Sequence, residues 1–116
     1  MVLTSFLQRL EEAPASIAFN DTIATVEALY EFSPTAFRNG ALLNEAGQNS
    51  GSCKIFSFAQ MHNLTAEQTL HCFGDYYRNE VLGDPNGANH QNIRSFMKTG
   101  WAGISFEGKA LTPRSA

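Results

Sequence analysis

Cys53 is the residue of this sequence best suited to nucleophilic chemistry. It follows Ser50-Gly51-Ser52 and precedes Lys54, at the expected beginning of a helix. A helix N-terminus and a neighbouring ammonium group both lower the pKa of a thiol, which is how nucleophilic cysteines are made. With His90 or His71 as the base, Cys53 would serve a small hydrolase or transferase. The alternative, which its apolar surroundings favour, is that Cys53 is a small core residue, as free cysteines usually are.

The histidines do not have the spacing of a metal site. His62, His71 and His90 are scattered along the chain, and the sequence contains no His-x-x-x-His and no Cys-x-x-Cys. Metal ligands normally come in such close pairs or clusters. His71 and Asp75 are four residues apart, which predicts a solvated pair on one helical face. We therefore expect neither a metal site nor a cofactor.

A second candidate site is a collection of polar, mostly uncharged side chains. It spans two segments, the first of which, residues 42–52, is expected to be irregular. Loops on a rigid scaffold commonly carry binding residues. If the segments are adjacent in the fold, they would form a polar groove suited to peptide, amide or sugar-like groups. The predicted ligand-binding residues are Asn44, Glu45, Gln48, Asn49 and Ser52 in the first segment, and His90, Gln91 and Asn92 in the second.

The loop from Gly47 to Lys54 also has some features of an anion site. It is rich in Gly, Ser and amide residues and precedes an expected helix N-terminus, where free backbone N–H groups attract phosphate or carboxylate. It lacks the Gly-Lys-Ser/Thr order of a phosphate-binding P-loop. We favour an ordered loop whose side-chain amides satisfy its own backbone.

The composition excludes several classes of partner. The chain of 116 residues has a net charge of −3, and only 16% of its residues are charged. Without a cluster of Lys and Arg, we expect it to bind neither nucleic acid nor a membrane surface. Met1 to Ala15 lack the basic region and apolar run of a Sec signal peptide. Two cysteines, Cys53 and Cys72, are too few for a disulfide framework, so we expect free thiols.

The spacing of apolar residues predicts a helix within residues 1–15 and a second helix after it. The first is ended by Pro14, and so short a helix is marginal alone, so it either docks on the core or is a mobile arm. The second has Asn20-Asp21 as capping residues and ends before Ser33-Pro34, because the residue before proline disfavours the helical region. Their apolar faces are Leu3, Phe6, Leu7 and Leu10 in the first, and Ile23, Val26, Leu29 and Tyr30 in the second.

The most apolar segment lies in the middle of the chain. Residues 53–62 are apolar on nearly every side, which predicts a helix at the centre of the core, with a strand as the alternative for so short a run. Thr65-Ala66-Glu67-Gln68 matches a capping box and predicts a further helix, whose apolar stripe continues to Val81.

A last helix is expected from Asn89. It would bury Ile93, Phe96 and Met97 and end at Gly100 in the left-handed conformation, with the next residue, Trp101, packed on Phe96.

Two extended segments, residues 35–37 and 104–106, could pair as strands, and the tail at residues 112–116 is expected to fray. Residues 1–116 are thus predicted to form a single compact, mainly helical α+β domain, with four or five helices and a small β-sheet.

Five blocks of the sequence resemble the HopJ family, and the likeness runs from about Ile17 to Leu111. Because the blocks are long and ungapped, the resemblance is specific. The blocks are Phe32-Ser33-Pro34-Thr35-Ala36-Phe37-Arg38-Asn39-Gly40, Asn44-Glu45-Ala46-Gly47-Gln48-Asn49, Gly51-Ser52-Cys53-Lys54-Ile55-Phe56, Cys72-Phe73-Gly74-Asp75-Tyr76-Tyr77-Arg78 and His90-Gln91-Asn92-Ile93-Arg94-Ser95-Phe96-Met97-Lys98-Thr99-Gly100-Trp101.

The family is named for a type III secretion effector of plant-pathogenic bacteria. The resemblance implies a non-enzymatic binding module whose partner is a host protein, a bacterial protein or a small polar ligand. It implies a place in the bacterial cytoplasm or, after type III secretion, inside a host cell. It carries over no catalytic residue. A bacterial housekeeping ligand-binding protein and the Cys53 enzyme are the alternatives, and the oligomeric state is left open.

Overall fold

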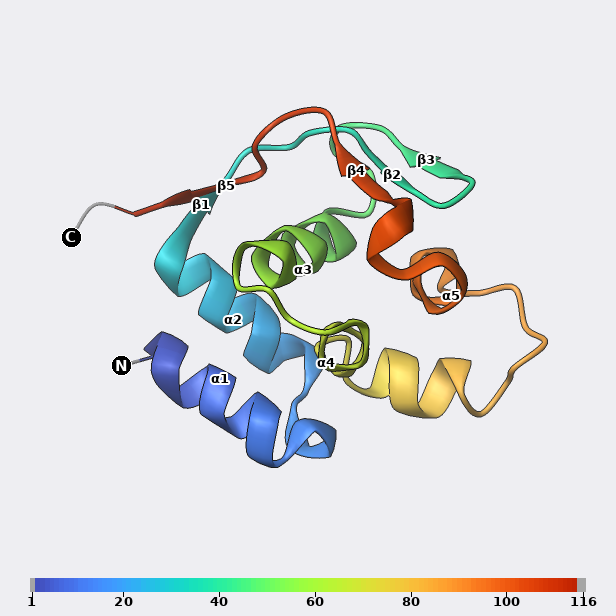
Figure 1. Cartoon of the computed structure of the whole chain (residues 1–116), viewed down its shortest axis with the longest axis horizontal. Helices are drawn as coiled ribbons and strands as arrows, with labels where there is room; N and C mark the ends of the chain where they lie inside the picture. Colours follow the sequence, from blue (N-terminus) through green and yellow to red (C-terminus); the bar gives the residue numbers. More distant parts are fainter. Residues whose placement is uncertain (1, 115–116) are drawn as a thin grey trace.

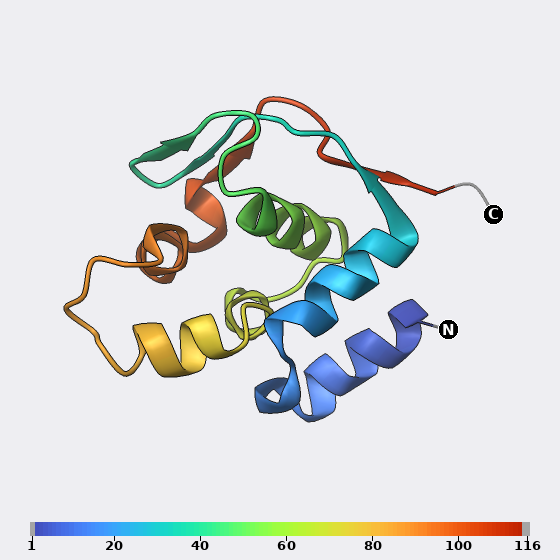
Figure 2. The same ribbon diagram turned by 180° about the vertical axis from the view of Figure 1, so that it is seen from behind.

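The computed structural model describes residues 2–114, which form five α-helices, shorter helical segments and two antiparallel sheets (Figures 1 and 2). The expected mainly helical α+β class is confirmed. The helices are α1 (Val2–Glu12), α2 (Phe19–Leu29), α3 (Ser50–Met61), α4 (Ala66–His71) and α5 (Gln91–Thr99), with the 3₁₀ turns η1 (Pro14–Ser16) and η3 (Gly100–Gly103) and the π-helix η2 (Tyr76–Val81). The strands are β1 (Tyr30–Phe32), β2 (Phe37–Asn39), β3 (Leu42–Asn44), β4 (Ile104–Phe106) and β5 (Leu111–Pro113).

Helix α3 is the centre of the core, as its apolar composition predicts (Figure 1). Phe56 and Phe58 have no exposed surface. The ring centroid of Phe56 lies 5.0 Å from that of Phe96 and 5.4 Å from that of Phe73. These contacts join α3 to α5 and to the segment after α4. A helix that is apolar on all sides is stable only when neighbouring elements cover all of its sides, as they do here.

Helix α1 docks on this core and lies beside α2 (Figures 1 and 2). Phe6 and Leu10 are buried, and the ring of Phe6 meets that of Phe58 edge-on at 5.7 Å. Of the two alternatives for the first fifteen residues, the structure has the docked helix. Burial of its apolar face stabilises a helix that would be marginal alone.

The ends of α2 differ from the prediction. Ala18 is the N-cap, so Asn20 and Asp21 lie in the first turn instead of capping it. Asp21 still stabilises the helix start, because its carboxylate accepts the N–H of Ala18 at 2.9 Å. At the other end Tyr30 leaves the helix and begins β1, because its backbone pairs with β5 instead.

The three-stranded sheet has the order β3-β2-β4, with both pairings antiparallel. The predicted pairing of the two extended segments is confirmed at Phe37, which lies opposite Phe106. The strand begins at Phe37 and not at Thr35. A second strand, β3, forms within the segment that was expected to be irregular, because the tight turn at Gly40, with φ +61°, folds it back on β2.

The tail of the chain does not fray from Thr112 as expected. Leu111–Pro113 pair with β1, and the N–H of Arg114 donates to the carbonyl of Leu29 at 3.0 Å. Leu111, which is 1% exposed, anchors this strand in the core. Residues 115 and 116 of the predicted tail lie outside the described residues.

The helix expected from residue 66 to 81 is interrupted. Its capping box is confirmed, since Thr65 and Gln68 exchange two hydrogen bonds of 3.0 Å. The α-helical part then ends at His71, because Gly74 has φ +62°, and η2 continues the chain. At Gly74 the chain turns and packs against the backbone at the start of α2.

Helix α5 follows His90, and its buried side differs in one residue from the prediction. Ile93 and Phe96 are buried as expected, but Met97 is 44% exposed. Asn92 is buried in its place.

The end of α5 also departs from the expected left-handed cap. Gly100 has the predicted positive φ of +58°, but its ψ of −151° is not that of the left-handed helix. Trp101 contacts Phe96 as expected, with ring centroids 5.1 Å apart.

Candidate functional site

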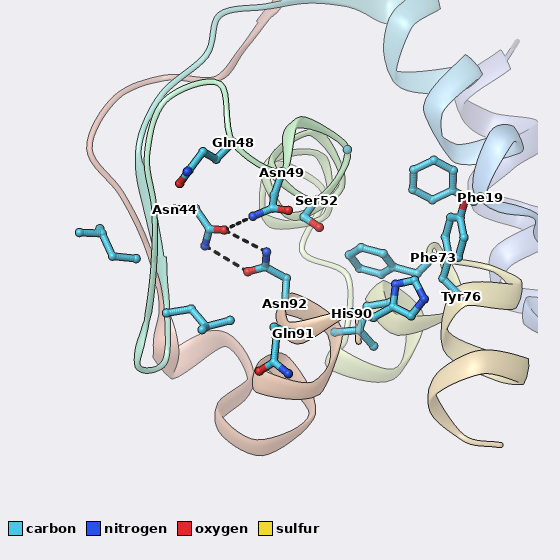
Figure 3. A pocket seen from close by; sticks show the side chains of 14 residues that line it. Phe19, Asn44, Gln48, Asn49, Ser52, Phe73, Tyr76, His90, Gln91 and Asn92 are labelled. Carbon is cyan, nitrogen blue, oxygen red and sulfur yellow. Dashed lines mark hydrogen bonds between the residues drawn. The ribbon is translucent and has the colours of Figure 1, made fainter. Parts of the chain in front are cut away.

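A cleft of about 830 Å³ opens between β3, the first turns of α2, α3 and α5, and the segment around η2 (Figure 3). The two polar segments singled out in the sequence meet there. The lining residues are Phe19, Leu42, Leu43, Asn44, Gln48, Asn49, Gly51, Ser52, Phe73, Tyr76, His90, Gln91, Asn92 and Ile93.

Four hydrogen-bonded asparagines form what we call the amide cluster (Asn39, Asn44, Asn49 and Asn92), and all but Asn39 line the polar end of the cleft. Asn44 and Asn92 exchange hydrogen bonds of 3.1 and 3.0 Å through both amide atoms. Asn49 donates to Asn44 Oδ1 at 2.6 Å, and Asn39 donates to the side-chain and backbone oxygens of Asn92 at 3.0 and 2.8 Å. The cluster therefore ties the three-stranded sheet to α5 and to the start of α3.

The role of these amides is partly structural, which the sequence did not indicate. Asn44 and Asn92 are 3% and 6% exposed, so they form the floor of the cleft. Asn39 is fully buried, although it was not among the predicted site residues. Asparagine supplies both donor and acceptor, so it can close a reciprocal pair of this kind. A buried amide pair costs stability if either partner is lost.

The N-cap residues of α3 and α5 both line the cleft in an unusual conformation. Asn49 and His90 each have φ +51°, and Asn and His are among the residues most often found there. Within residues 2–114, neither side chain makes a capping hydrogen bond to its own helix. The backbone N–H groups of both first turns thus lie at the edge of the cleft.

The opposite end of the cleft is aromatic. Phe19 meets Tyr76 edge-on with centroids 5.0 Å apart, and the ring of His90 lies 5.1 Å from that of Tyr76 at 38° (Figure 3). Phe73 closes the base and is 2% exposed, whereas Tyr76 is 40% exposed. We call Phe19, Phe73, Tyr76 and His90 the aromatic wall. Sequence reasoning missed its three carbocyclic rings, because Phe19 lies more than fifty residues before Phe73 and Tyr76 in the sequence.

The remaining predicted residues divide between the cleft and its surroundings. Gln48, Ser52 and Gln91 line it, whereas Glu45 does not. Gln48 Oε1 accepts the backbone N–H of Glu45 at 3.0 Å, which holds this loop in an ordered turn. The side chain of Gln91 donates to the carbonyl of Ala88.

Cys53 is placed as a core residue. It is 2% exposed, it does not line the cleft, and its Sγ lies 4.0 Å from the carbonyl of Thr35. Burial raises the pKa of the Cys53 thiol, the opposite of what a nucleophile needs. The predicted bases are engaged elsewhere: His90 Nε2 lies 2.7 Å from Glu80, and His71 Nδ1 lies 3.2 Å from Arg78. The structure does not bring either histidine to Cys53.

The partner of His71 is Arg78 and not the expected Asp75. An arginine only donates, so His71 Nδ1 is the acceptor and the ring is neutral. Burial and the charge of Arg78 both lower the pKa of His71. Arg78 also donates to the carbonyls of Ile17 and Pro14 and so clamps the chain before α2.

Both thiols are expected to resist alkylation in the folded protein. Cys53 and Cys72 are unpaired and buried, and burial raises the pKa of Cys72 to about 12. Iodoacetamide at neutral pH should therefore modify neither thiol until urea unfolds the chain, as followed by mass spectrometry. Rapid modification of Cys53 alone in the native protein would contradict this and would revive the enzyme alternative.

Neither metal ligation nor a membrane span emerges from the described part of the chain. No three His, Cys, Asp or Glu residues between positions 2 and 114 are grouped so that they could hold a metal ion. In the same range, no helix has the length and apolar character needed to cross a membrane.

Comparison with known proteins gives one family and one closely similar structure. The family model for "HopJ type III effector protein" matches residues 3–111. The crystal structure of an unknown function protein, VPA0580, is 50% identical in sequence and superposes with a TM-score of 0.96, covering 98% of this chain and 95% of that one. No curated protein gives a significant match.

Proposed function

Because the chain belongs to the HopJ type III effector family, we propose that it is a binding module of the effector type that recognises an uncharged polar group in the cleft. The family match covers nearly the whole chain. The ligand would be a polar small molecule or a polar group on a partner.

The chemistry of the cleft lining is the observation that carries this proposal. None of the described residues that line it is Asp, Glu, Lys or Arg, and an amide end faces an aromatic end across about 830 Å³. Cavities of this size with a few polar groups among apolar ones are the usual form of small-molecule sites. The lining lacks an activated nucleophile, which favours binding over catalysis.

Blocking the cleft should abolish binding without unfolding the protein. Ser52 lines the cleft at the first turn of α3, so Ser52→Trp would fill the space between the two ends. In a set of neutral polar fragments (amides, esters and sugars), we expect at least one class to shift the NMR signals of Gly51 and of the Asn44 and Asn92 side chains, and the variant to lose these shifts.

Ser105→Trp is the matched control, because Ser105 is exposed on β4 and does not line the cleft. It should keep the wild-type response. Fragments that bind only outside the cleft, or not at all, would refute the proposal.

Delivery into a host cell tests the effector part separately. We expect a fusion to a calmodulin-dependent reporter to give signal in plant cells exposed to secretion-competent bacteria, and none with a secretion-defective strain. A signal from neither strain would favour the housekeeping alternative, in which the same cleft binds a ligand inside the bacterium.

A further inference from the structure

The two buried amides at the polar end of the cleft retain hydrogen-bond donors but no acceptors. Asn44 Oδ1 accepts from Asn49 and Asn92, and Asn92 Oδ1 accepts from Asn39 and Asn44. A carbonyl oxygen has two lone pairs, so both oxygens are fully used. Each Nδ2 donates one of its two hydrogens within the pair, which leaves one N–H on each. A ligand that reaches this floor must therefore supply acceptors.

The helix starts beside the amide cluster add donors of the same kind. Gly51 and Ser52 at the start of α3, and Gln91 at the start of α5, line the cleft. The first backbone N–H groups of a helix have no partner within it. Like the free N–H groups of the two amides, these backbone N–H groups need hydrogen-bond acceptors from the ligand.

The aromatic wall sets a different requirement at the other end. Tyr76 is 40% exposed in the cleft, and the ring of Phe19 supports it edge-on. An exposed, braced aromatic ring packs best against a flat apolar face. The ligand therefore has an apolar face on one side and hydrogen-bond acceptors on the other.

The lack of charged residues in the lining also restricts the charge of the ligand. Among the described lining residues only His90 is basic, and its Nε2 lies 2.7 Å from Glu80. A cationic ligand would lose its hydration without gaining an ion-pair partner, which is costly. An anionic ligand would gain only the partial positive charges of the two helix N-termini and no basic side chain free of Glu80.

We infer that the ligand of the cleft is a neutral saccharide, an inference that rests on the proposed function. A pyranose ring has an apolar face of C–H groups for Tyr76, and its hydroxyl and acetamido oxygens accept from the donors of the amide end. A peptide without a ring side chain fits less well, because it offers no flat C–H face to pack against the exposed ring of Tyr76. The volume of about 830 Å³ accommodates more than one ring.

The test is an NMR titration of the full chain with four probes at millimolar concentration. Cellobiose and N,N′-diacetylchitobiose are the neutral saccharides. Sorbitol has the hydroxyl groups without the ring, and N-acetyl-alanyl-alanine methylamide represents a neutral peptide. We expect only the two saccharides to shift the side-chain amide signals of Asn44, Asn49 and Asn92.

The variant Tyr76→Ala tests the aromatic end, with Met97→Ala as the control. Both side chains are about equally exposed, at 40% and 44%, and Met97 does not line the cleft. Loss of the Tyr76 ring should weaken saccharide binding roughly three- to tenfold, the range expected for one aromatic contact. Met97→Ala should leave the affinity unchanged.

Three outcomes would overturn the saccharide inference. Equal shifts with sorbitol would show that the ring face contributes nothing. Shifts with the peptide probe alone would assign the cleft to another ligand class while leaving the proposed function intact. Failure of the saccharides together with the whole fragment set would overturn both.

Discussion

Replacing Gly74 with alanine should destabilise the fold by about 3 kcal/mol or more. Gly74 has φ +62°, where a Cβ is unfavourable. An added Cβ would also lie 2.5 Å from the backbone nitrogen of Phe19 and 3.0 Å from the carbonyl carbon of Ala18. Both are backbone atoms at the start of α2, so no rotamer change relieves the contact. Urea unfolding of the two proteins measures the difference.

Gly47→Ala separates the two causes. Gly47 also has a positive φ, of +88°, but a Cβ there would meet no atom within 4 Å. This variant should lose only about 1 kcal/mol, the cost of the backbone conformation. If the two variants were equally stable, the close approach of Gly74 to α2 would contribute nothing. In Gly74→Ala we also expect Phe19 to move, which would disturb the aromatic wall.

The second large effect is expected in the amide cluster. Asn92→Ala leaves the buried Nδ2 of Asn44 without its partner, and Asn44→Ala does the same to Nδ2 of Asn92. Each substitution should cost about 2 kcal/mol or more, the penalty for an unsatisfied buried polar group. The double variant should lose less than the two single losses together, by about 1 kcal/mol or more, because each single variant orphans the other residue.

Urea unfolding of the two single variants and the double variant measures this coupling. Gln48→Ala is the control, because Gln48 lines the same cleft but is exposed. It should cost no more than about 1 kcal/mol, because it loses only the exposed hydrogen bond to the N–H of Glu45. Strict additivity of the two asparagine substitutions would contradict the interaction described here.

The elements with strong local signals were predictable. The all-apolar segment gives the central helix α3, and the capping box at Thr65 gives the start of α4, because both depend on neighbours in sequence. From the sequence alone, the two polar segments could be expected to form a groove only if they were adjacent in the fold. The sequence shows which side chains are able to form hydrogen bonds. It does not show that the side-chain oxygens of Asn44 and Asn92 are both fully occupied by other members of the amide cluster.

The features that were missed depend on distant parts of the chain. Strands β3 and β5 have three residues each, too few to show an alternating pattern, and they form because β2 and β1 supply partners. The break at Gly74 follows from its packing on Ala18 and Phe19, more than fifty residues away in sequence. The aromatic wall was missed for the same reason.

The pairing of the strands also dictates when the protein can fold. Tyr30 pairs with Pro113 and Phe37 with Phe106, so each sheet joins an early segment to residues near the end of the chain. Contacts of such long sequence separation form slowly. During synthesis neither the β1–β5 nor the β2–β4 pair can form until residues 104–113 have left the ribosome. The nascent chain therefore lacks both of these pairings until its last two strands have been made.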